Sequence, residues 1–209
     1  MRFMACLAQC RARPTKGNML LTQLSTVKGR LNIDDSVDDT LLVMLINGAA
    51  GRFERECNRK FDRAVNATYE FPADTLEIIP ERYPIESVSS LELKSSEATG
   101  WVPQEVDYII YRKSVISLLN TLGGEREVAR VTYTAGYVLP GTVPDAGQEP
   151  LPAEIEFSCI EQVAYWYQNR HRLGLVSVSG EGGAIQQFAQ LDLLPHVKAV
   201  LKSHERYIL

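Results

Sequence analysis

The spacing of apolar residues at the start of the chain predicts two helices. Apolar side chains recur at helical intervals from Leu21 to Leu31, and Thr22 is a suitable N-cap, so we expect a helix over residues 22–31. A polar turn follows, and the sequence "SVDD" after it matches the Ser-x-x-Asp capping signature. This signature predicts a second helix over residues 37–58, with one apolar face.

The pattern changes between residues 67 and 134, where short runs are rich in β-branched and aromatic residues. The runs are "ATYEF", "LEII", "SVSSLEL", "DYIIY", "SVISL" and "EVARVTY", and prolines and glycines separate them. This alternation predicts an antiparallel meander of strands. The stretch "KSSEATGWVPQE" between two of the runs is expected to be an exposed hairpin loop, in which Trp101 is a lid on the sheet or a contact residue.

Two further helices are predicted near the end of the chain. Pro152 suits the first position of a helix over residues 153–172. Its two apolar stripes are Ile155, Cys159, Val163 and Trp166, and Phe157, Ile160, Ala164 and Tyr167. A helix that is apolar on two sides is expected between layers or between subunits. After the glycine-rich "GLVSVSGEGG", interpreted as a flexible connection, Pro195 opens an amphipathic helix over residues 195–207.

The length and composition favour one domain with elaborations. A chain of 209 residues with 45% hydrophobic residues can bury a core of its own, and we assign that domain to residues 19–209. Residues 1–18 show no periodic pattern and match a secretory signal poorly. We interpret them as a disordered extension, or as a segment that precedes a natural start at Met19. No apolar run is long enough to cross a bilayer, so no membrane partner is expected.

The charge and the cysteines narrow the functional classes. A formal net charge of -4 and an isoelectric point near 5.5 argue against a protein whose main task is to grip phosphates. The four cysteines are Cys6, Cys10, Cys57 and Cys159. We expect reduced thiols in a cytosolic setting, because a chain of this size does not need disulfides. The first two cysteines have no second pair or nearby histidine to complete a zinc site.

The sequence predicts no catalytic, cofactor or metal site. His171, His196 and His204 lack the spacing of a triad or of a metal-binding helix, so capping or surface roles are expected. The stretch "SGEGGA" lacks the Gly-Lys-Ser/Thr of a phosphate-binding loop. The aspartates at 34–39 lack the central glycine and the closing glutamate of a calcium loop. A hydrolase would therefore need a site that the sequence does not reveal.

One basic stretch is a candidate nucleic-acid interface. Residues 52–63, "RFERECNRKFDR", contain five cations, and a small nucleic-acid-binding module would use Arg55, Arg59 and Lys60 there. The cations alternate with Glu54, Glu56 and Asp62, so the net field is small. A solvated helix face is the simpler interpretation.

The order of these motifs resembles a known family. The chain contains, in this order, "LTQLSTVKGRLNIDDSVDDTLLVMLINGAAGRFERECNRKF", "YPIESVSSLEL", "VTYTAGY", "LPAEIEFSCIEQVAYWYQNR" and "LPHVKAVLKSHERY". Together they resemble the head-tail connector, or adaptor, proteins of long-tailed phages and prophages, from Leu20 to Tyr207. The resemblance implies an α+β fold, a small helical bundle with an antiparallel β-sheet or hairpin insertion. It also implies that the protein is not an enzyme.

The resemblance further implies a place in the virion. Such adaptors form a homo-oligomeric ring, commonly of twelve copies, under the portal protein, and the ring extends the DNA channel toward the tail. The implied partners are the portal protein, a stopper or tail-completion protein, and duplex DNA that passes without sequence recognition. The implied location is the capsid-tail neck, after assembly in the host cytoplasm. A head-completion stopper or tail-completion protein of the same neck is the nearest alternative.

The resemblance assigns candidate contact residues. Portal docking is assigned to Arg206, Tyr207, Ile208 and Leu209, and to Val197, Val200 and Leu201, which would place the last helix. The subunit interface is assigned to Phe157, Ile160, Tyr167 and Trp101, because a ring subunit must bury two different surfaces against its neighbours. Deletion of residues 195–209 is expected to abolish portal attachment. The first eighteen residues and the long strand region depart from the family pattern.

Overall fold

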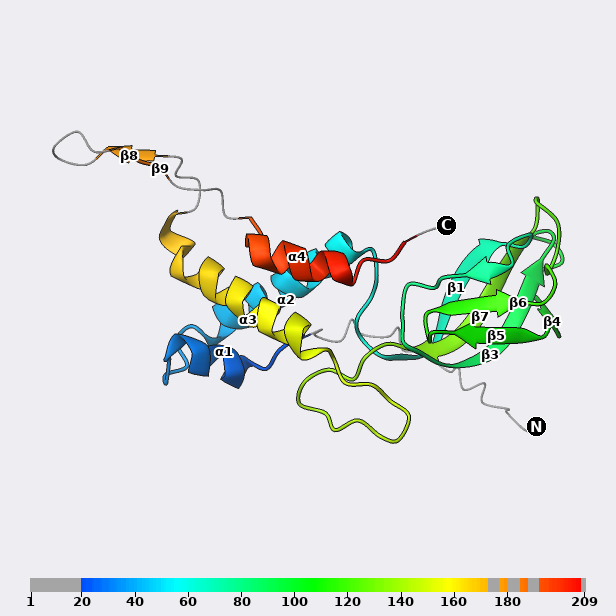
Figure 1. Cartoon of the computed structure of the whole chain (residues 1–209), viewed down its shortest axis with the longest axis horizontal. Helices are drawn as coiled ribbons and strands as arrows, with labels where there is room; N and C mark the ends of the chain where they lie inside the picture. The colour runs from blue at the N-terminus through cyan, green and yellow to red at the C-terminus, as the bar shows by residue number, and fades with distance from the viewer. Residues whose placement is uncertain (1–19, 173–176, 180–184, 188–191, 208–209) are drawn as a thin grey trace, which may run out of the picture.

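A computed structural model describes residues 20–172, 177–179, 185–187 and 192–207. Figure 1 shows the helices gathered at one side of the molecule and the seven-stranded insertion at the other. The helices are α1 (Leu24–Leu31), α2 (Asp39–Cys57), α3 (Ala153–Gln168) and α4 (Pro195–Ser203), with a 3-10 turn at Arg170–Arg172. The α+β fold class, a helical bundle with an antiparallel β insertion, is thereby confirmed. Among the described residues, no helix combines the length and apolarity needed to span a membrane.

The first two helices begin later than expected, because their predicted capping side chains are engaged elsewhere. Thr22 is buried, and its hydroxyl donates to the Glu156 carboxylate at 3.2 Å, so Gln23 becomes the N-cap. α2 starts at Asp39, whose carboxylate accepts from Lys28 of α1 at 2.7 Å. The Ser-x-x-Asp capping prediction is therefore wrong. Both helices end at an asparagine in the left-handed region, which closes the last turn.

The helices share one apolar core. α2 packs on α3, and α4 and α1 pack on this pair. The fully buried side chains include Val27, Leu42, Ile46, Phe53, Ile155, Val163 and Val197. Each buried aliphatic or aromatic side chain of this kind stabilises the fold by about 1.5–3 kcal/mol relative to exposure. The bundle therefore has its own hydrophobic core.

The seven strands of the insertion follow α2 and precede α3 in the sequence. They form two antiparallel sheets. The strands are β1 (Ala64–Pro72), β2 (Glu77–Ile78), β3 (Ile85–Lys94), β4 (Val102–Gln104), β5 (Tyr108–Tyr111), β6 (Val115–Leu118) and β7 (Val128–Ala135). The sheet orders are β1-β7-β3-β4 and β2-β6-β5, and a second apolar core fills the space between the sheets. The predicted meander is wrong, because β7 lies between β1 and β3. The expected hairpin loop also contains a strand, since β4 pairs with Leu91–Leu93.

The insertion leaves and rejoins the bundle at one point. Ala64, the first residue of β1, lies opposite Ala135, the last residue of β7. Beyond this pair, the Tyr137 N–H donates to the Phe61 carbonyl at 2.9 Å. Gly136 between the strand and Tyr137 has φ +109°, and a Cβ there would lie 2.8 Å from the Arg63 Cα. The segment that enters β1 and the segment that leaves β7 approach each other so closely here that only glycine fits at position 136.

The last part of the chain differs from expectation in two places. The glycine-rich stretch that the sequence predicts to be a flexible connection contains β8 (Ser177–Ser179), which pairs antiparallel with β9 (Ile185–Gln187). The rest of that stretch lies outside the described residues. α4 ends at Ser203 instead of residue 207. The chain leaves the helix there because the Arg206 N–H is bonded to the Cys57 carbonyl, at 2.8 Å.

Candidate functional site

The residues after α4 connect the bundle to the insertion, and we call His204–Tyr207 the C-terminal strap. In Figure 1 this segment runs from α4 toward the sheets. Arg206 Nη1 donates to the Ile79 carbonyl at 3.0 Å, and its guanidinium lies 5.7 Å from the Tyr69 ring. The Tyr83 hydroxyl donates to the His204 carbonyl at 3.3 Å. The strap therefore fixes the end of the chain against β-insertion residues.

A buried arginine lies in the same junction. The Arg59 side chain is 2% exposed, and its guanidinium stacks 3.3 Å above the Tyr83 ring, with Phe61 and Tyr137 at 5.0 and 5.3 Å. It donates to the Tyr83 carbonyl, and its Nε has no hydrogen-bond partner among the described residues. Burial raises the pKa of the Tyr83 hydroxyl. Within the described part of the chain, three aromatic rings surround this cation and no carboxylate forms an ion pair with it.

The structure separates the residues assigned to portal docking. Val197 and Leu201 are buried in the helical core, and Arg206 is 7% exposed within the strap. Val197 and Leu201 are assigned to placing the last helix, and this assignment and that of Arg206 stay predictions, although none of the three side chains is exposed in this conformation. Val200 is half-buried and Tyr207 is exposed. Ile208 and Leu209 lie outside the described residues, and portal docking itself stays a prediction.

The four residues assigned to the subunit interface also occupy different environments. Phe157 is 58% exposed on α3, whereas Ile160 is buried in the helical core. The Tyr167 hydroxyl donates to Asp38 within the chain. Trp101 is half-buried, with the Arg130 guanidinium 4.2 Å from its ring, as expected of a lid on the sheet. The second stripe of α3 is thus largely buried inside the subunit, and Phe157 remains its exposed member.

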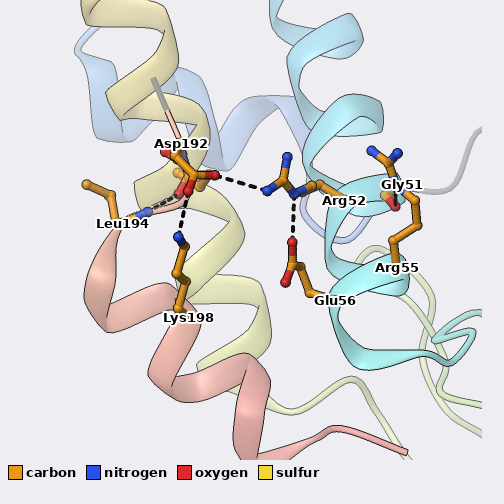
Figure 2. A network of polar contacts seen from close by, with 8 residues as sticks. Gly51, Arg52, Arg55, Glu56, Asp192, Leu194 and Lys198 are labelled. Atoms are coloured by element: carbon orange, nitrogen blue, oxygen red, sulfur yellow. Dashed lines mark hydrogen bonds and ion pairs between the residues drawn. The ribbon is translucent and has the colours of Figure 1, made fainter. Parts of the chain in front are cut away.

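The basic stretch does not form a basic face, because acidic side chains neutralise it. Figure 2 shows Arg52 between Glu56 at 2.9 Å and Asp192 at 3.0 Å, and Lys198 on the other side of Asp192 at 2.5 Å. The Lys198 hydrogen bond lowers the pKa of Asp192. Lys60 pairs with Glu54 at 2.6 Å. Since Arg59 is buried, the nucleic-acid module predicted from Arg55, Arg59 and Lys60 lacks the surface that it requires.

The ionisable groups do not converge on a cavity among the described residues. His171 and His196 are exposed. His204 has an acidic partner that its sequence spacing did not suggest, since its Nε2 lies 2.5 Å from a Glu154 carboxylate oxygen. A groove of about 440 Å³ runs along β3 and is lined by residues 88–91 and 104–108. That lining contains Glu105 and Asp107 together with Ser89 and Ser90, but no histidine, cysteine, lysine or arginine. No hydrogen bond between one of these serines and one of these carboxylates is found there, so the groove shows no paired nucleophile and base.

We expect two cysteines to be unreactive in the folded protein. Burial raises the pKa of Cys57 and of Cys159 to about 12, so both remain protonated thiols at neutral pH. In a variant with Cys6→Ser and Cys10→Ser, titration with a thiol reagent at pH 8 should detect reactive thiol only after denaturation. Rapid reaction of either cysteine in the native protein would contradict the buried positions.

Comparisons with known proteins agree with a structural assembly protein. The chain matches the head completion protein family over residues 20–207 and belongs to that family. This membership confirms the resemblance to phage connector proteins and makes the protein a structural component of head completion. A comparison with curated proteins found no match.

Solved structures share the fold at low sequence identity. One chain from the neck of a native gene transfer agent particle, determined with C12 symmetry, has a TM-score of 0.56 and 13% identity, and the match covers 94% of both chains. A chain from the neck of an empty gene transfer agent particle, determined with C6 symmetry, has a TM-score of 0.54 and 13% identity. The match covers 89% of this chain and 90% of that chain. These matches extend the fold assignment over nearly the whole chain.

Proposed function

We propose that this protein acts in the neck of a tailed-phage type of particle, as a ring of identical copies under the portal. Membership of the head completion family carries this proposal, and the fold shared with neck chains of particles with C12 or C6 symmetry supports it. A twelve-membered ring fits that symmetry. The protein acts by its position in the assembly and not by catalysis.

A ring subunit must offer two different surfaces that fit each other. The bundle carries exposed apolar side chains on separate helices, with Met44 on α2 and Phe157 on α3. Exposed apolar residues of this kind are covered when subunits meet. We assign the ring contact to the bundle, with Phe157 in the interface.

The charge distribution suits a channel through which duplex DNA moves. Arg52, Lys60 and Lys198 are held in internal ion pairs, so they do not form a strip of free cations. A surface that neutralises many phosphates would bind DNA tightly in a salt-dependent manner. We infer that DNA passes through the ring without sequence recognition and without strong phosphate pairing.

Portal attachment is assigned to the end of the chain beyond the strap, at Tyr207, Ile208 and Leu209. Deletion of residues 195–209 would be a poor test, because it removes Val197 and Leu201 from the core. We expect deletion of residues 207–209 alone to abolish binding to purified portal rings while the circular dichroism spectrum stays unchanged. Val143→Ala, in an exposed loop, is the control and should bind normally.

Electron microscopy of the complex would decide between the adaptor and its nearest alternative. An adaptor ring should lie in direct contact with the portal. Density for this chain one layer further toward the tail would instead identify a stopper or tail-completion protein of the same neck. A chain that neither binds portal nor forms rings at high concentration would contradict both assignments.

A further inference from the structure

The outer face of the β5-β6 hairpin is apolar and exposed. Ile109 of β5 is 71% exposed, Tyr111 is also exposed, and Leu119 just after β6 is 69% exposed. The register places Ile109 opposite Ser117 and Tyr111 opposite Val115, so these side chains share one face. Figure 1 shows the hairpin in the insertion, away from the four helices. Such a face on a sheet edge is a candidate contact surface.

β5 is also the unblocked edge of the insertion. It lies at the end of the three-stranded sheet, and its sequence Tyr-Ile-Ile-Tyr contains no charge, proline or glycine. The three other sheet edges carry features that discourage pairing. β1 has a bulge near Asn66 and ends at Pro72, β2 has two residues, and β4 has three residues that include Pro103.

The backbone of β5 has hydrogen-bonding groups that point outward. The Leu119 N–H donates to the Asp107 carbonyl at 2.9 Å, so the odd-numbered residues of this strand face β6. Backbone groups alternate in direction along a strand. The N–H and C=O groups of Tyr108 and Ile110 therefore face the free edge, where no strand of the described chain pairs with them.

The charges that flank β5 are arranged in one direction. Glu105 and Asp107 precede the strand, and Arg112 and Lys113 follow it in the turn to β6. Lys113 pairs with Glu149 of the same chain, whereas the Arg112 side chain is exposed. A second strand that runs antiparallel and carries the same sequence would place its basic end against this acidic end. Opposite charges across a strand pair are favourable, so β5 is complementary to itself.

We propose that two copies of this protein associate through β5, antiparallel about a two-fold axis. Tyr108 of each copy pairs with Ile110 of the second copy, which satisfies the outward backbone groups of both strands. In this register Ile109 meets Ile109 of the second copy, and the acidic residues before β5 lie at the end where the basic turn of the second copy begins. The two three-stranded sheets become one sheet of six strands, and its exposed apolar face is partly covered.

This contact is separate from the proposed ring. A two-fold contact uses the same patch on both copies, whereas a ring uses two different patches. The pairing therefore belongs to the unassembled protein, where it covers an edge that would otherwise promote aggregation. A variant that loses the pairing should still assemble into a ring on the portal, so the two proposals can fail independently.

Sedimentation equilibrium tests the pairing on the full chain. The wild-type protein should show a monomer-dimer equilibrium. Ile109→Lys should weaken the dimer at least about tenfold, because it removes a central apolar contact and opposes two cations. Val143→Lys introduces the same charge in a loop outside β5, at a residue that is 87% exposed. This variant should leave the dimer unchanged. A wild-type protein that is monomeric at all concentrations would overturn the proposal.

A charge exchange tests the direction and register of the strands. Glu105→Lys and Arg112→Glu should each weaken the dimer about threefold to tenfold, because each brings like charges together at both ends of the strand pair. Arg112 is used here because Lys113 is already paired with Glu149 of the same chain, at 2.6 Å. The double variant restores both opposite pairs and should return the dimer toward wild-type strength. Additive weakening in the double variant would overturn the antiparallel β5 contact. Dimers that survive Ile109→Lys would overturn it as well, and would point to another surface.

Discussion

Gly136→Ala should lower the free energy of unfolding by about 3–5 kcal/mol, the largest loss expected from one methyl group in this protein. The residue has φ +109°, a conformation that alanine rarely adopts. The added Cβ would also overlap the Asp62 backbone, and backbone atoms cannot move aside as a flexible side chain can. Urea denaturation followed by circular dichroism gives the loss directly.

Gly48→Ala is the matched control for this experiment. Gly48 lies within α2, and a Cβ there would meet nothing within 4 Å. Because alanine is the better helix former, we expect this variant to gain up to about 1 kcal/mol. Equal destabilisation by the two substitutions would contradict the special geometry of Gly136.

Arg59→Ala should destabilise the protein by about 2–4 kcal/mol, because it removes a buried side chain and leaves a cavity among three aromatic rings. Arg59→Met keeps most of the volume and removes the charge. Since the Arg59 Nε lacks a hydrogen-bond partner among the described residues, we expect the methionine variant to stay within about 1 kcal/mol of the wild type. Urea denaturation of both variants separates the contribution of the side chain's volume to the unfolding free energy from that of its charge.

Arg112→Ala is the control for Arg59. The Arg112 guanidinium lies 5.0 Å from the Tyr111 ring, but both residues are exposed. Loss of that contact should change the unfolding free energy by less than about 1 kcal/mol. If Arg59→Met were as damaging as Arg59→Ala, the cation itself, and not its volume, would hold the junction together.

The sequence predicted the elements better than their arrangement. Periodicity located the helices and six of the strands, because burial of one face leaves a regular pattern along the chain. It did not predict that β7 lies between β1 and β3, since strand order depends on where the chain rejoins the bundle. The N-cap predictions failed because Thr22 and Asp39 are bound by residues of other helices.

The contact residues were harder to predict than the fold. An apolar stripe does not reveal whether its partner is another helix of the same chain or a neighbouring subunit, and Ile160 and Val197 proved to face the chain's own core. Arg206 is assigned to portal docking by the resemblance, and the structure shows it buried against Ile79 and Tyr69. Such long-range contacts leave no local pattern. The self-complementary charges around β5, by contrast, are visible in the printed sequence.

The shared attachment point of the β insertion has a practical consequence. Because Ala64 and Ala135 lie opposite each other in neighbouring strands, residues 64–135 could be exchanged for a foreign domain whose own ends lie close together. The helices would keep their separate core. A graft at this point would display one cargo molecule per copy, so an assembled particle could be loaded with a fixed number of enzymes or antigens at a single vertex.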